Sequence, residues 1–120
     1  MHSVLFYKTR AGRDVLLDWI RSLPEADRRI VGEDLRTVQK AFPVGLPVCD
    51  NLGGGLWEVR SSLSSKCEAR LIFFQSSSAK ALVVVHGFIK KTRKTPAAEL
   101  ILARRRMNEF QPGHSKKDRP

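Results

Sequence analysis

The sequence predicts an α+β fold of the order β-α-α-β-β-β-α, in which helices cover one side of an antiparallel β-sheet. Three observations support this prediction. Three strand-like segments follow one another between residues 56 and 88, two stretches with helical periodicity precede them, and one more follows them. A chain of 120 residues is long enough to bury a core, so we expect residues 1–110 to form a single domain.

The N-terminal third contains one strand and two helices. Residues 3–8 (SVLFYK) are rich in β-formers, which predicts a first strand. Apolar residues recur at helical spacing over residues 13–23, which predicts a short amphipathic helix. Pro24 suits the first turn of a second helix, and an apolar stripe continues from there to Phe42.

A break rich in proline and glycine separates this helix from the strands. Pro43, Gly45 and Pro47 end the helix, and the triple glycine at 53–55 extends the break. A phosphate-binding loop is strongly disfavoured, because no Gly-Lys-Ser/Thr follows the glycines and the next element is a strand. We therefore expect a flexible loop or a bulge here.

The three strand signals cover residues 56–63, 67–75 and 81–88. Their connections are short and mostly polar, so the strands should form an antiparallel meander. The last is a largely apolar run, as expected for a strand covered on both faces. Strand alternation divides the first segment into two faces: Leu56, Glu58 and Arg60 on one, and Trp57, Val59 and Ser61 on the other.

The C-terminal region begins with a basic loop and continues as a helix. Thr95 and Pro96 form a helix start, with an N-cap hydroxyl followed by proline at the first helical position. The helix should run to Phe110, with Arg104 and Arg105 mostly off its apolar stripe. Residues 111–120 contain no large apolar side chain, and we expect a disordered basic tail.

Positive charge is concentrated near the C-terminal end. The formal net charge is +10, and residues 88–120 hold ten Lys/Arg against three Asp/Glu, a net of +7. A concentrated positive field attracts polyanions, of which nucleic acids are the most common. The alternative is a solubilising surface, which we favour for the lysines and arginine of the tail.

Several function classes find little support in the residues. Glu58 and Glu68 are the only acids between residues 56 and 98, which disfavours a carboxylate pair. The three histidines are widely separated, so we expect neither a metal site nor a cofactor. The two cysteines lack zinc-ligand spacing and should be reduced thiols. No secretory signal or membrane-spanning run is visible, and we expect a cytoplasmic protein.

A set of cations remains, located on the strands and on the loop after them. In an antiparallel meander these residues can converge on one part of the sheet: Arg60, Arg70, Lys90, Lys91, Arg93 and Lys94. Cations suffice to cleave RNA, because the ribose 2′-hydroxyl is a built-in nucleophile. Arginine suits the phosphate oxygens, and a lysine among other cations can transfer a proton.

Each of these residues also has a purely structural interpretation. Arg70 lies beside an apolar run and could form a salt bridge, for instance with Glu58, without losing a functional role. The basic loop could be a solvated surface. His86 has a side chain suited to proton transfer, but at the end of an apolar strand a satisfied structural histidine is equally expected.

Four parts of the sequence together resemble the phage-derived branch of the HigB toxins in the RelE superfamily. They are Leu56-Trp57-Glu58-Val59-Arg60, then Ala69-Arg70-Leu71-Ile72, then the run from Val85 to Pro96 with its K-K-T-x-K-T-P pattern, and then Glu99 with Ala103 to Arg105. The likeness extends over about residues 3–110. The lysine-rich pattern is specific in this context, whereas a lone Trp-Glu pair is not.

The resemblance implies a RelE-like toxin fold and endonucleolytic cleavage of mRNA, usually on the translating ribosome. It also implies neutralisation by a co-encoded antitoxin, typically a helix-turn-helix protein. Carried over by position, Arg60, Arg70, Lys90 and Lys91 would line the active site, and Glu58 would orient an arginine. Some relatives use a C-terminal aromatic residue or histidine, but Phe110 cannot transfer a proton and His114 lies in the expected tail.

The leading hypothesis is therefore a metal-independent, ribosome-dependent mRNA endonuclease, the growth-inhibiting toxin of a type II toxin–antitoxin pair. Catalysis would involve Arg60, Arg70, Lys90, Lys91 and His86, and RNA binding would involve Arg93, Lys94, Arg104 and Arg105. The alternative is a non-catalytic RNA- or DNA-binding module, although the loop 89–95 contains no aromatic residue for base stacking. A third possibility is a subunit that binds only a protein partner.

Overall fold

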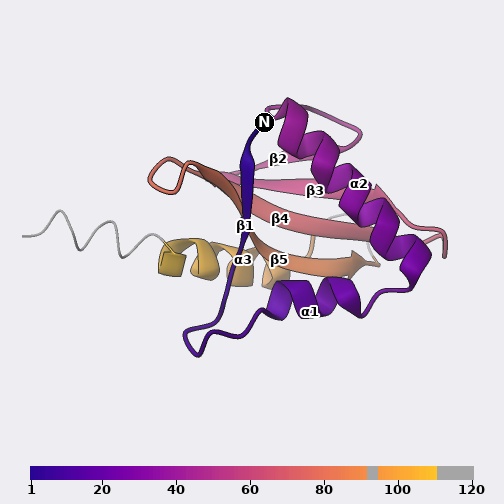
Figure 1. The fold of residues 1–120 in the computed structure, drawn as a ribbon, viewed down its shortest axis with the longest axis horizontal. Helices are drawn as coiled ribbons and strands as arrows, with labels where there is room; N and C mark the ends of the chain where they lie inside the picture. Colours follow the sequence, from indigo (N-terminus) through magenta and orange to yellow (C-terminus); the bar gives the residue numbers. More distant parts are fainter. Residues whose placement is uncertain (92–94, 111–120) are drawn as a thin grey trace, which may run out of the picture.

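The computed structural model describes residues 1–91 and 95–110 (Figure 1). Two helices follow the first strand, four strands come next, and a third helix ends the described chain. The elements are β1 (Ser3–Phe6), α1 (Val15–Arg21), α2 (Glu25–Ala41), β2 (Cys49–Gly53), β3 (Leu56–Ser62), β4 (Glu68–Ser76), β5 (Ala81–Lys90) and α3 (Ala97–Phe110). The expected disordered tail lies outside the described residues.

The five strands form one mixed sheet in the order β1-β5-β4-β3-β2. The predicted antiparallel meander is confirmed for β3, β4 and β5. The prediction of a purely antiparallel sheet is wrong, because β1 pairs with β5 in parallel, with Ser3 opposite Ala81. The order of the elements in the sequence could not reveal this pairing, because β1 is the first strand in the chain and β5 is the last.

Strand β2 was not predicted, and the expected loop over this region is wrong for residues 49–53. The segment CDNLG lacks β-branched residues, yet it pairs antiparallel with β3 through Cys49 opposite Val59. Tertiary pairing outweighs its weak propensity. The predicted bulge is confirmed by a register shift between Asn51 and Gly53, and Gly54 and Gly55 turn the chain with φ of 61° and 88°.

Helices pack against both faces of the sheet, so the expectation that they cover one side is wrong. Helices α1 and α2 pack on the face that carries Val59, Leu71 and Val84. Helix α3 packs on the opposite face, against Leu56, Ile72, Phe74, Val83 and Val85. The apolar stripes predicted all three helices, but a stripe does not indicate which face of a sheet it will cover.

A β-bulge interrupts β5 and decides which way its second half faces. Phe73 is opposite Val84, but Ile72 is opposite His86, so Val85 is an extra residue on β5. Val83 and Val85 pack on the α3 side, and the shift brings His86 and Phe88 to that side as well. Residues after a bulge thus reverse the alternation set before it.

The face under α1 and α2 is closed by tight packing and buried polar contacts. A side chain at Gly87 would meet the Trp19 ring of α1 at 2.8 Å. Asp27 of α2 is buried and accepts hydrogen bonds from the backbone N–H and the hydroxyl of Ser64, which secures the β3–β4 turn. Burial also raises the pKa of the Cys49 thiol to about 11, which keeps this thiol protonated.

No helix in the described part of the chain is long and apolar enough to cross a membrane.

Candidate active site

Polar side chains from three adjacent strands share the face of the sheet on which α3 packs. Cross-strand neighbours form three rows: Ser62–Glu68–Lys90, then Arg60–Arg70–Phe88, then Glu58–Ile72–His86. We call Glu58, Arg60, Glu68, Arg70, His86 and Lys90 the polar patch. Neighbouring strands lie about 4.8 Å apart and alternate residues on one strand about 7 Å apart, so the patch measures about 10 by 14 Å.

Arg70 lies at the centre of the polar patch and is only 1% exposed. Its Nη2 donates to Glu68 Oε1 at 2.5 Å, and its Nη1 donates to the backbone oxygen of Ala69 at 3.2 Å. Its Nε is 3.5 Å from Glu58 Oε2, an ion pair that lacks hydrogen-bond geometry. The salt bridge considered in the sequence is therefore present, and direct contact of Arg70 with a phosphate stays a prediction.

Glu68 marks the exposed edge of the polar patch, with a side chain that is half exposed. The hydrogen bond from Arg70 lowers the pKa of Glu68, and the charge of Arg70 lowers it further. Smaller contributions come from Arg60 and Lys90, which shows that these two cations act on the same carboxylate. Positive charge thus exceeds negative charge at this edge.

Glu58 joins the polar patch to the start of α3. Its side chain is buried, and its Oε1 accepts a hydrogen bond from the Thr95 hydroxyl at 3.0 Å. Helix α3 begins at Ala97, so the predicted start, with Thr95 as N-cap and Pro96 as the first helical residue, is one residue too early. Thr95 contacts Glu58 from outside the helix. Through Arg70 and Thr95, the Glu58 carboxylate holds β4 and the end of the basic loop together.

His86 makes the closest contact of the polar patch with α3. Its Nε2 is 2.5 Å from Glu99 Oε1, and its ring stacks on Phe88 with 5.6 Å between centroids. The side chains of His86 and Glu99 are 13% and 31% exposed. The sequence analysis included Glu99 in the resemblance but assigned it no role, although it is the one acidic residue in the first turn of α3 and could have been paired with a nearby histidine.

The remaining predicted cations differ in position. Arg60 and Lys90 are half-buried members of the polar patch, and Lys91 is exposed directly after β5. Arg93 and Lys94, predicted to bind RNA, lie outside the described residues. Arg60, Arg70 and Lys90 therefore share one face, as the sequence predicted.

The arginines of α3 are separated from the polar patch. Arg104 and Arg105 are exposed, and Arg104 Nη1 donates to the backbone oxygen of Gly54 at 3.4 Å. Arg106 instead supports the fold. Its Nη1 donates to the backbone oxygen of Val85 at 2.9 Å, and its guanidinium carbon lies 4.9 Å from the centre of the Tyr7 ring. Arg106 thus binds the carbonyl of the bulge residue.

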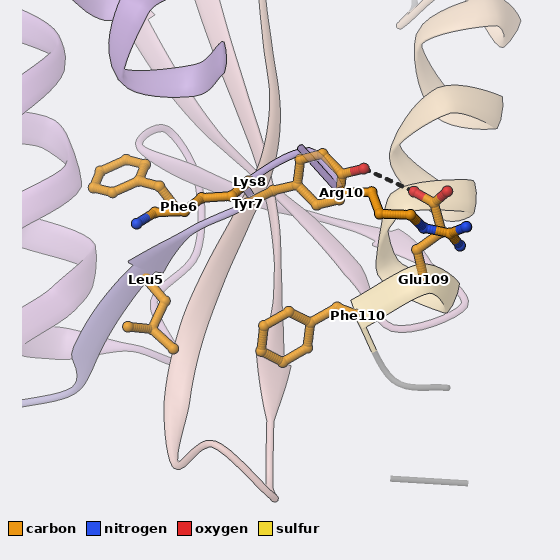
Figure 2. Close-up of a pocket in the computed structure, with 7 residues that line it drawn as sticks. All are labelled: Leu5, Phe6, Tyr7, Lys8, Arg10, Glu109 and Phe110. Atoms are coloured by element: carbon orange, nitrogen blue, oxygen red, sulfur yellow. Dashed lines mark hydrogen bonds between the residues drawn. The ribbon is translucent and has the colours of Figure 1, made fainter. Parts of the chain in front are cut away.

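A cavity of about 520 Å³ lies at a different place, between the end of β1 and the C-terminal end of α3 (Figure 2). Figure 2 shows Leu5 and Phe110 along its apolar side, with Tyr7 and Glu109 joined by a hydrogen bond of 2.8 Å. Burial and the neighbouring Glu109 raise the pKa of Tyr7. Because the predicted cations lie elsewhere, this cavity is not part of the candidate site.

The polar patch is suited to bind a phosphodiester and move protons. Arg60 and Lys90 supply positive charge, Glu58 and Glu68 hold Arg70, and His86 supplies an imidazole supported by a carboxylate. Within residues 1–91 and 95–110, no three His, Cys, Asp or Glu side chains form a group that could hold a metal ion.

Comparison with known families supplies an independent finding. Residues 18–108 match the family described as phage-derived protein Gp49-like (DUF891), and this range includes the whole polar patch. No curated protein sequence matches the chain. The match covers most of the chain, and the family is one of phage-derived, toxin-like proteins. The chain therefore belongs to the Gp49-like family, within the RelE/HigB-like toxins.

Proposed function

We propose that this protein is the toxin of a type II toxin–antitoxin pair and that it cleaves mRNA on the ribosome without a metal ion. The polar patch is the observation that carries the proposal. Four predicted catalytic residues, from three different strands, meet on one face of the sheet: Arg60, Arg70, His86 and Lys90. The toxin-like family supports the same function.

The chemistry requires no nucleophile from the protein. The ribose 2′-oxygen attacks the adjacent phosphorus, and the bond from phosphorus to the 5′-oxygen breaks. The 2′-hydroxyl proton goes to a base, and the departing 5′-oxygen receives a proton from an acid. The products are a 2′,3′-cyclic phosphate and a 5′-hydroxyl end.

The residues of the polar patch and cations near it divide this work. Arg60 binds the scissile phosphate from the half-buried edge of the patch, and Arg70 adds a fixed cation behind it. Lys90 or Lys91 stabilises the charge that develops in the transition state and supplies a proton. Glu58 positions Arg70, and the arginines and lysines of the loop and α3, among them Arg104 and Arg105, bind the RNA on either side.

The sharpest test uses cations that do not hold the fold together. Arg60→Ala with Lys91→Ala should lower cleavage by at least about 100-fold, since fixed cations aimed at developing charge are each worth about 3 kcal/mol. The matched control is Arg36→Ala with Lys40→Ala, which removes the same two residue types from exposed positions on α2, behind the other face.

The measurement is the mapping of new 5′ ends after brief expression, with growth followed in parallel. Wild type and control should arrest growth and produce discrete ends carrying 5′-hydroxyl groups. In a cell-free translation reaction, cleavage should persist when the purified protein has been freed of metals by a chelator. If the double variant were to cleave like the control, the site assignment would be wrong. Salt-sensitive RNA binding by wild type without new ends would instead identify a non-catalytic RNA-binding module.

We extend the proposal to the partner that the resemblance implies, a co-encoded helix-turn-helix antitoxin. A short adjacent gene for such a protein should restore growth when it is expressed together with the toxin. An adjacent gene without this effect would remove the antitoxin from the proposal and leave the nuclease test unchanged.

A further inference from the structure

The contact between His86 and Glu99 brings together two elements that the basic loop separates in the sequence. His86 lies on β5 immediately after the bulge residue Val85, and Glu99 lies in the first turn of α3. Their 2.5 Å contact is one of the two shortest ion-pair distances among the described residues. It therefore sets the orientation of the histidine relative to the polar patch.

The chemistry of this contact determines which nitrogen is available for proton transfer. An ionised carboxylate has only acceptor sites, so the hydrogen between the two groups must be on Nε2 of His86. In a neutral imidazole, a hydrogen on Nε2 leaves the lone pair on Nδ1. A carboxylate that accepts from one ring nitrogen also stabilises the imidazolium that forms when the other nitrogen takes a proton.

The ring is held on a second side as well. Phe88 stacks on it, with 5.6 Å between centroids and 21° between planes, and Phe88 itself is buried opposite Arg70. Arg106 Nη1 binds the carbonyl of Val85, the residue directly before His86. The position of the imidazole is thus fixed by the aromatic neighbour, the backbone anchor and the carboxylate of Glu99.

We propose that Glu99 is a positioning residue which fixes the Nε2–H tautomer of His86, so that Nδ1 accepts the 2′-hydroxyl proton during RNA cleavage. This inference rests on the proposed function. Nδ1 takes the proton as the bond from the 2′-oxygen to phosphorus forms, and the lysine ammonium protonates the 5′-oxygen as its bond to phosphorus breaks. Lys90 is suited to the second task, because it projects from the same face of β5 beyond Phe88.

The test compares Glu99→Gln with Glu109→Gln, the same change ten residues later on the same helix. Glu109 also accepts a hydrogen bond, from the Tyr7 hydroxyl, but lies beside the cavity and outside the polar patch. A glutamine amide can either accept from or donate to Nε2, so Glu99→Gln removes the constraint on the tautomer and leaves the size of the side chain nearly unchanged.

The first readout is spectroscopic and independent of activity. Long-range ¹H–¹⁵N correlation spectra of the purified protein should show the Nε2–H tautomer of neutral His86 in wild type and Glu109→Gln. Glu99→Gln should show a mixture of tautomers. An unchanged tautomer in Glu99→Gln would overturn the positioning role.

The second readout is single-turnover cleavage of mRNA on translating ribosomes, with the protein in excess. Glu99→Gln should lower the maximal rate about 10- to 100-fold with an unchanged half-saturating concentration, as expected when a partner that orients a functional histidine is lost. Glu109→Gln should cleave like wild type. A wild-type rate in Glu99→Gln, or a change confined to the half-saturating concentration, would overturn the inference and leave the proposed function standing.

Two further outcomes are distinguishable. If Glu99→Gln does not fold, Glu99→Asp replaces it, because it retains a carboxylate on a shorter side chain. Glu99→Asp should lower the maximal rate by less than the about 10- to 100-fold expected when the carboxylate is lost. If Glu99→Asp kept both the wild-type rate and the wild-type tautomer, the distance between the carboxylate and His86 would not matter for catalysis. If wild type itself makes no cut, the proposed function fails and this inference fails with it.

Discussion

The two faces of the sheet are built from the same strands but differ in how completely helices cover them. Helices α1 and α2 close one face over a core that includes Val59, Leu71 and Val84. Helix α3 alone covers the other face, and its apolar cluster extends into the rows of the polar patch at Ile72 and Phe88. The polar patch lies beside this cluster, and Glu99 in the first turn of α3 contacts its His86. Charge is therefore concentrated on the face that only one helix covers.

The two faces also differ in the interactions that stabilise them. On the α3 face, Arg70 is buried among carboxylates, so the stability of this face depends on charge pairing. On the other face, Gly87 leaves the space that the Trp19 ring occupies, so the stability of that face depends on close packing. Stability on one face should thus respond to charge, and stability on the other to volume.

The largest expected effect comes from Arg70→Met. The substitution keeps much of the side-chain volume but leaves Glu58 as a buried carboxylate without its ion-pair partner among the described residues. Breaking one side of a buried pair costs about 3–5 kcal/mol, which should appear in the free energy of unfolding measured with urea.

A double-mutant cycle shows whether charge pairing is the cause. Arg70→Met combined with Glu58→Gln should be less destabilised than the sum of the two single changes, because neither variant side chain then leaves a charge unpaired between these positions. Additive losses would mean that Arg70 and Glu58 do not stabilise each other, and the pairing of this buried carboxylate would no longer explain the effect of Arg70→Met.

Gly87→Ala tests the closed face, and its effect should be smaller. An added Cβ would lie 2.8 Å from two carbons of the Trp19 ring, so overpacking should cost about 1–3 kcal/mol. Gly32→Ala on α2 is the matched control. Its Cβ would meet nothing within 4 Å, and replacing a helical glycine by alanine should stabilise the protein by about 0.5–1 kcal/mol. Thermal unfolding should give shifts of opposite sign; equal shifts would show that the space around Gly87 is not limiting.

The smallest effect concerns the exposed edge of the polar patch. The pKa of Glu68 is lowered in the folded protein by the hydrogen bond and charge of Arg70. Its ionised form therefore adds stability above its unfolded pKa of about 4.3, and this contribution is lost as the pH falls through the lower folded value. Glu68→Gln should reduce the urea midpoint of unfolding more at pH 7 than at pH 3. Equal reductions at the two pH values would contradict a stabilising ion pair between Glu68 and Arg70.

Most elements of the fold followed from sequence periodicity. Three helices and the three strands of the meander have apolar patterns that depend on local sequence. Strand β2 was missed because CDNLG has weak strand propensity and gains its structure by pairing with β3. The parallel neighbour of β5 was missed because it depends on a contact between distant parts of the chain.

The candidate site was predicted in part, for a related reason. Arg60 and Arg70 face the same way because strand alternation holds through β3 and β4. No residue type in the run from Leu82 to Val85 marks the bulge, so alternation could not show that His86 and Lys90 share the face of Val83. The role of Glu99 was not predicted, because its contact with His86 forms only when α3 folds back over the sheet.

The extra residue at Val85 has a consequence for how this strand can vary. Removing Val85 would restore an unbroken alternation and leave His86 opposite Ile72 and Lys90 opposite Glu68, whereas regular pairing of Val85 with Ile72 would turn the imidazole and Lys90 towards α1. The unpaired residue therefore keeps the two side chains on the α3 face in a strand of this length. When relatives are aligned, a one-residue gap at this point is compatible with the same polar patch, while a shift of the later residues by one position without a gap is not.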